Sequence, residues 1–229
     1  MVRMSSPYPA AVLWDMDGTL VDTEPFWMAA EGPLVASYGG TWTHEQALGL
    51  VGMGLEDSAG ILQRAGVRMQ TQEIIDHLTD TVSDRLRIEG APFRPGAREL
   101  LFELREAGVK TALVTMSMRR MADTVISAIP FEAFDIVIAG DEASRPKPHP
   151  DPYLQASRAL GVDIADTVAI EDSPNGLRSA VASGAVALGV PLMVPLDGVG
   201  AHELWESLAG RTVADLAALH ARHRLGASA

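Results

Sequence analysis

The stretch LWDMDGTLVDTEP, residues 13–25, carries four acidic side chains within ten positions, and two of them, Asp15 and Asp17, directly follow a short apolar run. Such a run suits a strand that is buried on both faces of a sheet, whereas like charges in a buried place need a partner or an ion. In open α/β sheets, ligands bind in the crevice at the carboxyl ends of the strands. The stretch therefore predicts a buried strand whose end faces a functional site.

Four further short apolar runs have the same character, and most are separated by segments with the three- and four-residue apolar spacing of a helix. Strands that alternate with helices predict an α/β fold, a Rossmann-like parallel sheet with right-handed crossovers. The expected strands cover residues 10–14, 111–115, 135–139, 167–170 and 185–190. The expected helices cover residues 96–107, 119–129, 150–160 and 174–183, with a terminal helix near 214–229 whose end frays.

Residues 24–90 interrupt this alternation. They contain helical patterns, such as EPFWMAAEGPLVASYG and TQEIIDHLTDTVSDRLRIEG, and no convincing strand. The stretch GAPFRPG, residues 90–96, has the Gly and Pro punctuation of a hinge. We therefore expect a small helical cap at residues 23–92, inserted into an α/β core formed by residues 1–22 and 93–229.

A second acidic pair, Glu171 and Asp172, follows the apolar run TVAI in the stretch AIEDSPNG. Two acidic clusters at neighbouring strand ends repel each other unless a cation lies between them. The chain has no cysteine, and its histidines show no metal-ligand spacing, so the available ligands are oxygen atoms. Oxygen ligands favour a hard divalent ion, and the sequence therefore predicts a Mg²⁺ site.

Two more expected strand ends supply hydroxyl groups and an amine. ALVTMS contains Thr115 and Ser117, whose hydroxyls can donate hydrogen bonds to a phosphate oxygen. SRPKPHPDPYL holds Lys147 between two prolines on a stiff loop. A cation at this place can neutralise phosphate charge and restrain a neighbouring carboxylate, so these residues favour chemistry on a phosphate ester.

Taken in order, the motifs Asp-x-Asp-Gly-Thr, an apolar run ending in Thr, Lys-Pro-x-Pro and Glu-Asp-Ser-x-x-Gly resemble those of the haloacid dehalogenase superfamily of phosphohydrolases, over nearly the whole chain. DMDGTLVDTEPFW and EDSPNGLRSAVASG look like its β-phosphoglucomutase and sugar-phosphatase branch. The resemblance implies that Mg²⁺ is held by Asp15, the backbone carbonyl of Asp17 and Asp172. It leaves Glu171 either a direct ligand or a neighbour of one.

The same resemblance implies the catalytic roles. Asp15 would be the nucleophile that attacks phosphorus and becomes an aspartyl phosphate. Asp17 would protonate the leaving oxygen and then deprotonate the attacking water, which requires it to be protonated when substrate is bound. Thr115 and Lys147 would grip the transferring phosphoryl group.

Several sequence features distinguish between the activities found in this superfamily. Dehalogenases lack the second motif-one acid, which is present here as Asp17, and phosphonoacetaldehyde hydrolases need a cap lysine, which residues 24–90 lack. A β-phosphoglucomutase-type mutase remains an alternative, although TEPFW and VGMGLED offer neither the His nor the Arg that those mutases place there. A phospho-acceptor signalling domain is less favoured, because a switch has no use for an acid/base residue or a substrate chamber. The residues expected to contact substrate are Trp27, Met53, Leu55, Met116, Ser117 and Asn175.

The composition of the chain limits which partners it can have and whether it can enter a membrane. The chain has 229 residues and a formal net charge of −12, from 18 Lys+Arg against 30 Asp+Glu, which argues against nucleic acid or anionic lipid as a partner. The N-terminus lacks a secretory signal, and the longest apolar stretch, residues 180–196, is broken by Gly and Pro, so we expect no membrane span. We expect a cytoplasmic, monomeric, Mg²⁺-dependent phosphatase that hydrolyses a small sugar or polyol phosphate monoester through an aspartyl phosphate.

Overall fold

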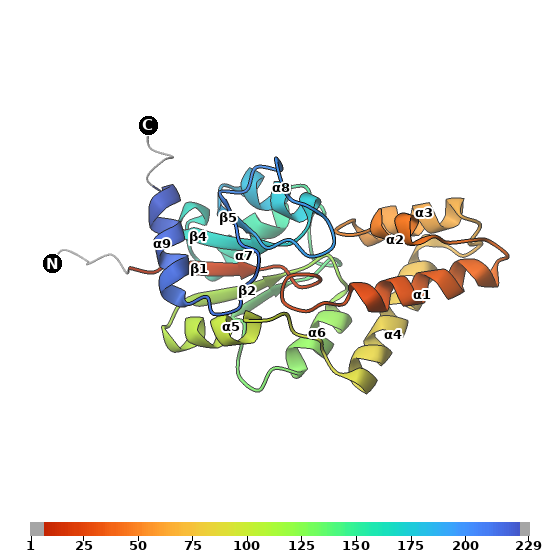
Figure 1. The fold of residues 1–229 in the computed structure, drawn as a ribbon, viewed down its shortest axis with the longest axis horizontal. Coiled ribbons are helices and arrows are strands. Elements are labelled where there is room, and N and C mark those ends of the chain that lie inside the picture. Colours follow the sequence, from red (N-terminus) through yellow and green to blue (C-terminus); the bar gives the residue numbers. More distant parts are fainter. Residues whose placement is uncertain (1–6, 225–229) are drawn as a thin grey trace.

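The structure, a computed structural model, describes residues 7–224. In this part of the chain, six parallel strands form one sheet in the order β3-β2-β1-β4-β5-β6 (Figure 1). The strands are β1 (Ala11–Trp14), β2 (Lys110–Val114), β3 (Ile136–Ile138), β4 (Thr167–Glu171), β5 (Val186–Gly189) and β6 (Glu203–Leu204). The chain order reverses at β1, between β2 and β4, which is the switch point where α/β sheets bind ligands.

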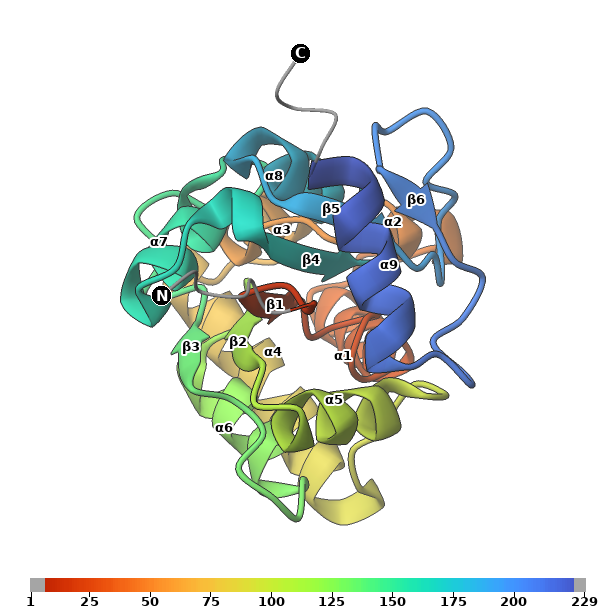
Figure 2. The same ribbon diagram turned by 90° about the vertical axis from the view of Figure 1, so that its left-hand side faces the viewer.

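Helices cover both faces of this sheet, as the view along the strands shows (Figure 2). Ala11 and Leu13 face α7 and α8, whereas Val12 and Trp14 belong to the larger core that includes residues of α5, α6 and α9. Successive residues of a strand point to opposite faces, so a strand that is apolar at every position needs cover on both. These helices are α5 (Ala97–Glu106), α6 (Arg119–Ser127), α7 (Asp151–Leu160), α8 (Pro174–Ser183) and α9 (Val213–Arg224), with a 3-10 turn at Ile164–Asp166.

The expected α/β class is confirmed, and the five expected strands and the helices between them occur within a few residues of their predicted bounds. Two details differ. The strand at 135–139 is not buried on both faces: β3 is an edge strand and half-buried. The two-residue β6 was not expected, because a strand so short leaves no periodic signal. The expected fraying at residues 225–229, and part of the N-terminal segment, lie outside the described residues.

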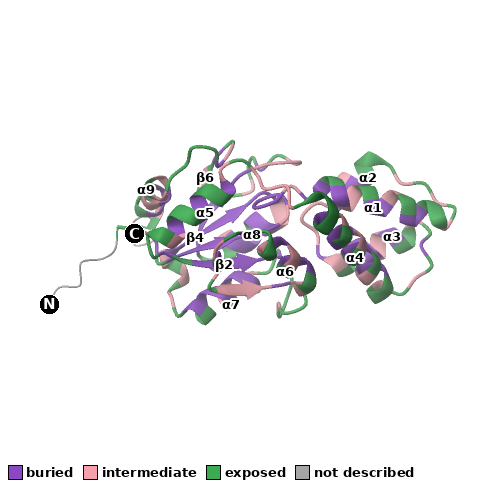
Figure 3. Ribbon diagram, turned by 90° about the horizontal axis from the view of Figure 1, so that it is seen from below, coloured by how far each residue is buried: buried purple, intermediate pink, exposed green. Residues whose placement is uncertain are grey.

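Residues 24–89 are helical and carry no strand. This helical insert contains α1 (Glu24–Ser37), α2 (His44–Leu48), α3 (Leu55–Arg64) and α4 (Thr71–Glu89), and it lies at one end of the sheet (Figures 1 and 3). Pro25 in the first turn of α1, where its missing N–H has no partner to lose, helps to start that helix. The last helix of the insert, α4, is followed by Gly90 as its C-cap, and the φ of 87° at this residue suits glycine.

Two chain segments connect the insert to the sheet, and they run side by side. Val21 forms an antiparallel bridge with Phe93, and the backbone N–H of Asp22 donates to the carbonyl of Pro92 at 2.8 Å. Away from these connections, Arg120 of α6 forms ion pairs with Asp76 and Asp80 of α4, at 2.7 and 3.0 Å. No described helix is long and apolar enough to serve as a membrane span.

Candidate active site

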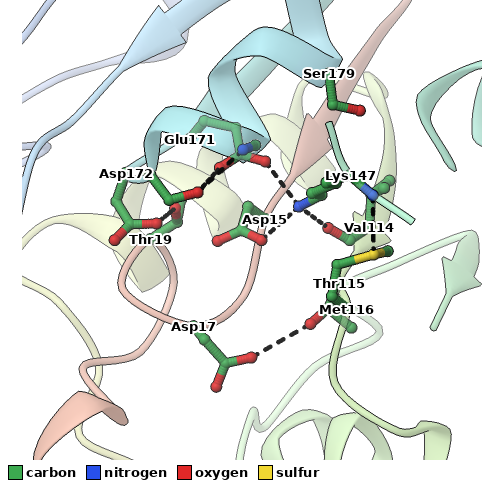
Figure 4. A network of polar contacts seen from close by, with 12 residues as sticks. Asp15, Asp17, Thr19, Val114, Thr115, Met116, Lys147, Glu171, Asp172 and Ser179 are labelled. Atoms are coloured by element: carbon green, nitrogen blue, oxygen red, sulfur yellow. Dashed lines mark hydrogen bonds and ion pairs between the residues drawn. The ribbon is translucent and has the colours of Figure 1, made fainter. Parts of the chain in front are cut away.

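The centre of the site is a buried ammonium group between two carboxylates (Figure 4). Nζ of Lys147 lies 2.6 Å from Oδ1 of Asp15 and 2.7 Å from Oε1 of Glu171, and it also donates to the backbone carbonyl of Val114 at 2.8 Å. Asp15 directly follows β1 and Glu171 ends β4, and these strands are hydrogen-bonded neighbours, so their carboxyl ends meet at one edge of the sheet. The parallel register thus brings together two carboxylates that lie far apart in sequence, and Lys147 reaches them from the loop before α7.

Asp172 completes a cluster of three buried carboxylates, since Asp15, Glu171 and Asp172 each offer an oxygen within 4.8 Å of the others. Oδ2 of Asp15 and Oδ2 of Asp172 are buried and accept no hydrogen bond from the described residues. Gly18 makes room for the cluster: its φ is +83°, and a Cβ built there would lie 2.0 Å from Oδ2 of Asp172. Two buried oxygens without partners, in a negative cluster, match the donor set that Mg²⁺ prefers.

The pKa shifts point to the same deficit of positive charge. Burial, and then the charge of Glu171, raise the pKa of Asp15 to about 7 even though Lys147 opposes them. Burial and the charge of Asp15 raise the pKa of Asp172 well above its usual range. For Lys147, burial alone would lower the pKa, but the two neighbouring carboxylates outweigh burial and raise it. One ammonium group therefore does not neutralise the cluster, and a bound cation fits it.

Glu171 and Asp172 are adjacent in sequence but have different surroundings. Oε1 of Glu171 receives the ammonium of Lys147 and the hydroxyl of Tyr153, the latter at 2.5 Å, and Oε2 receives the hydroxyl of Ser173 at 3.5 Å. Gly176 leaves space for this carboxylate, because a Cβ there would lie 1.9 Å from Oε2. Both oxygens of Glu171 thus have protein partners, whereas Asp172 keeps one oxygen without any.

Asp17 lies between the sheet and the helical insert. Its Oδ2 accepts hydrogen bonds from the hydroxyls of Ser117 and Thr115, at 2.6 and 3.3 Å, and its carboxylate is turned toward Thr115 (Figure 4). Its Oδ1 accepts from the hydroxyl of Thr23 and from Nε1 of Trp27, the latter at 3.2 Å. The predicted acid/base residue therefore connects the end of β2 to the start of α1.

A cavity opens between the sheet edge and the helical insert. Its lining includes four predicted catalytic residues, Asp15, Asp17, Thr115 and Lys147. Five of the six expected substrate residues also line it: Trp27, Met53, Leu55, Met116 and Ser117. Asn175 is not part of this lining; it lies in the first turn of α8 and accepts a hydrogen bond from Arg178, so its position does not support a contact with substrate.

The insert closes over the cavity at Gly52. This residue has φ +69°, and a Cβ built on it would lie 2.4 Å from Cβ and Oγ of Ser173, at the N-cap of α8. The loop before α3 therefore rests directly on the core beside the acidic cluster. Sequence reasoning missed this contact, although the motif VGMGLED signals a Gly-rich turn at that place.

Other functional candidates were also missed. The guanidinium of Arg94 donates to the carbonyls of Gly18, Val190 and Pro191 at 2.6, 2.8 and 3.2 Å, which fixes the loop that carries Asp17. A lone Arg in a hinge sequence gives no signal of this role. Glu24 and Glu31 of α1 line the cavity as buried carboxyl groups. Their seven-residue spacing, with Trp27 between them, is a signal that could have shown a shared face.

Comparisons with known proteins agree with this geometry. A family model described as haloacid dehalogenase-like hydrolase matches residues 12–190. A phosphorylated carbohydrates phosphatase of Thermotoga maritima is 30% identical over 178 residues, which cover 76% of this chain and 81% of that protein. Hexitol phosphatase B of Escherichia coli is 29% identical over 193 residues, which cover 82% and 86%.

Among solved structures, a CbbY variant of Rhodobacter sphaeroides in complex with xylulose-(1,5)bisphosphate superposes with a TM-score of 0.83 at 28% identity, covering 91% of this chain and 99% of that one. The family model spans well over half of the chain, and the matched relatives are aligned across most of their own length. The family expected from the sequence motifs is thus confirmed: the chain belongs to the haloacid dehalogenase-like hydrolases and is an enzyme of the phosphoric monoester hydrolase class.

Proposed function

We propose that the protein is a Mg²⁺-dependent phosphatase that hydrolyses a small sugar or polyol phosphate monoester through an aspartyl phosphate on Asp15. The observation that carries the proposal is the setting of Asp15 at the base of the cavity. One carboxylate oxygen is held by Lys147, and the other accepts no hydrogen bond from the described residues. An oriented carboxylate with one free oxygen suits nucleophilic attack on phosphorus.

Mg²⁺ would be held by Asp15, Asp172 and the backbone carbonyl of Asp17. We assign Glu171 to a position behind the ligands, because its oxygens already receive Lys147, Tyr153 and Ser173. When bound, the ion supplies positive charge that offsets the repulsion between the nucleophile and a dianionic ester.

The residues of this chain would then act in two steps. In the first, an oxygen of Asp15 bonds to phosphorus as the bond to the leaving oxygen breaks, and Asp17 gives that oxygen a proton. In the second, water attacks phosphorus, Asp17 takes the proton from the water, and Asp15 is released together with inorganic phosphate. Lys147 and Thr115 would balance charge on the phosphoryl oxygens in both steps.

We further propose that the helical insert is a mobile cap, residues 23–92, on a core of residues 1–22 and 93–229. The hydrogen bonds from Thr23 and Trp27 to Asp17 would form on closure, so that the cap position and the acid/base group are coupled. Closure would exclude water other than the attacking molecule. We expect a monomer that works in the cytoplasm.

Mutase activity is less well supported. A mutase must hold a substrate or intermediate with a second phosphate, which needs a cation away from the reacting centre. Among the described residues that line the cavity, the insert contributes no Lys or Arg.

Phosphate release tests the proposal. Purified protein with Mg²⁺ is assayed on hexose, hexitol, glycerol and glycolate phosphates and on p-nitrophenyl phosphate, with and without glucose 1,6-bisphosphate to detect isomerisation. We expect turnover that EDTA abolishes and that Asp15→Asn lowers by at least about 10⁴-fold. Release of no phosphate from any of these esters, by a protein that melts cooperatively, would show that the proposed function is wrong.

A further inference from the structure

The face of α1 that lines the cavity carries two buried carboxyl groups. Glu24 and Glu31 are only 8% and 4% exposed, and both line the cavity. They are seven positions apart, so they lie on one side of the helix, roughly 10 Å apart along its axis. Trp27, three positions after Glu24, lies between them on the same side and reaches Asp17. Glu24, Trp27 and Glu31 therefore form a line along α1 that runs from the reacting centre into the insert.

Of the four oxygens of these carboxyl groups, one receives a hydrogen bond from a described residue. Nε1 of Trp42 donates to Oε2 of Glu31 at 2.9 Å and so holds that carboxyl group in place. No described residue donates to Oε1 of Glu31 or to either oxygen of Glu24. These oxygens are not among the fully buried atoms that lack a partner, so they are open to the cavity and can accept hydrogen bonds from its occupant.

Burial raises the pKa of Glu24 to about 8, with the charges of Asp17 and Glu31 adding to it. Burial also raises the pKa of Glu31, against the opposing hydrogen bond from Trp42. Near neutral pH Glu24 can thus accept a hydrogen bond as a carboxylate or donate one as an acid. Hydroxyl groups are matched to both forms.

The remaining walls differ in character. Leu50 and the α4 residues Ile74, Ile75 and Leu78 line the same cavity with apolar side chains. A sugar or polyol presents C–H groups as well as hydroxyl groups, and a cavity with apolar walls and a few placed polar groups suits such a molecule.

Charge limits the occupant further. Lys147 is the single basic side chain among the described residues that line the cavity, and it already contacts Asp15 and Glu171. A second phosphate or carboxylate on the substrate would find no cation in the insert and would meet two acidic side chains instead. Unpaired like charges in a desolvated site are unfavourable.

We propose that Glu31, held by Trp42, is a specificity-determining residue that hydrogen-bonds hydroxyl groups of the leaving group, with Glu24 doing so nearer the reacting end. Together they select monophosphates of uncharged sugars or polyols against esters that carry a second anionic group. The inference rests on the proposed phosphatase function and names the part of the cavity that sets its preference.

Its test compares kcat/KM for a hexitol 6-phosphate, a hexose 1,6-bisphosphate and p-nitrophenyl phosphate in the presence of Mg²⁺. We expect the wild type to prefer the hexitol ester to the bisphosphate by at least about tenfold. Glu31→Leu should lower the ratio of hexitol to p-nitrophenyl activity by at least about tenfold, as expected for lost hydrogen bonds to a buried carboxyl group. Trp42→Phe should lower the same ratio by less. The matched control is Glu56→Gln, an exposed acid of α3, which should leave the ratio within about twofold.

The outcomes separate the two proposals. If Glu31→Leu folds and keeps the wild-type ratio, or if the wild type prefers the bisphosphate, the specificity role is wrong and the phosphatase function stands. If Glu31→Leu does not fold, Glu31→Gln is assayed instead, because it keeps the shape of the side chain and the acceptor for Trp42 but has no carboxyl group. An unchanged preference of Glu31→Gln against the bisphosphate then overturns the specificity role of Glu31. A wild type that hydrolyses none of the esters overturns both proposals.

Discussion

Replacing Lys147 by methionine tests how the acidic cluster is held together. The ammonium group contacts Asp15 and Glu171 at 2.6 and 2.7 Å, and the lysine side chain is 3% exposed. Removing one partner of a buried charge cluster costs about 3–5 kcal/mol, because the remaining carboxylates stay buried without a cation. We expect Lys147→Met to lower the free energy of unfolding by that amount at pH 8 in EDTA, and to lower phosphatase activity by at least about 10²-fold.

The loss of stability should depend on pH in a defined direction. In the wild type, Lys147 opposes the rise of the Asp15 pKa that burial and Glu171 cause. Without the ammonium group, the pKa of Asp15 rises further, so the folded variant binds more protons than the folded wild type at any pH between the two values. More protons bound in the folded state means that the variant loses stability faster as pH rises. The deficit should therefore be largest at pH 8 and shrink toward pH 5.

Urea unfolding followed by tryptophan fluorescence in EDTA measures the deficit at each pH. Lys110→Met is the matched control. Lys110 is the only other lysine of the sequence, it is the exposed first residue of β2, and its ammonium group donates to the carbonyl of Leu160 at 2.6 Å. The control should cost no more than about 1 kcal/mol, with no trend with pH. Equal deficits for the two variants, or a Lys147→Met deficit that does not change between pH 5 and pH 8, would show that Lys147 does not hold the acidic cluster together.

Two further results are expected. Gly52→Ala places a Cβ 2.4 Å from the side chain of Ser173 at a φ of +69°, so the insert should close poorly and kcat/KM should fall by about 10- to 100-fold. The control is Gly54→Ala, whose Cβ meets nothing nearer than 3.6 Å and which should have little effect. Equal effects of the two variants on steady-state kinetics would count against the contact between Gly52 and Ser173. In EDTA the free energy of unfolding should fall as pH rises from about 4 to about 8. The reason is that the folded state raises the pKa of Asp15 from 3.8 to about 7 and that of Glu24 from 4.5 to about 8. In this range the folded state binds more protons than the unfolded state, so each group costs up to about 1.4 kcal/mol of stability per pH unit. Millimolar Mg²⁺ should flatten the part due to Asp15, and a thermal-melting series that shows the same pH trend with and without Mg²⁺ would contradict the metal site.

The parts of the site that sequence could predict are those that follow from strand ends. Asp15, Thr115 and Glu171 each end or follow an apolar run, and the carboxyl ends of adjacent parallel strands share one edge of the sheet. The meeting of these residues then follows from the order β2-β1-β4, which places the three strand ends side by side. Lys147 was predictable for a different reason, because its two flanking prolines stiffen a loop that begins near the same edge.

What sequence could not predict depends on side-chain surroundings. Glu171 and Asp172 look alike in the stretch AIEDSPNG, and the difference between them comes from Tyr153 and Lys147, which are distant in sequence. Trp27 was expected to contact substrate, but its hydrogen bond to Asp17 depends on how the insert is placed over the sheet. Such contacts are set by packing between segments, which hydrophobic periodicity does not encode.

The distribution of charge in the cavity explains how a protein with a net charge of −12 can bind an anion. Among the described residues that line the cavity, Lys147 is the single basic side chain, and it adjoins the three buried carboxylates. The other lining residues are acidic, apolar or uncharged polar. Under the proposed function, a phosphate ester would enter with its phosphoryl group at the sheet edge and its uncharged part along α1. Orientation by charge would limit the reaction to one phosphorus atom and would work against the reorientation that a mutase needs between its two half-reactions. The proposed exclusion of a second anion by Glu24 and Glu31 would thus also favour hydrolysis over isomerisation. Glu31→Lys, which reverses the charge at that position, should raise kcat/KM for a bisphosphate relative to a monophosphate.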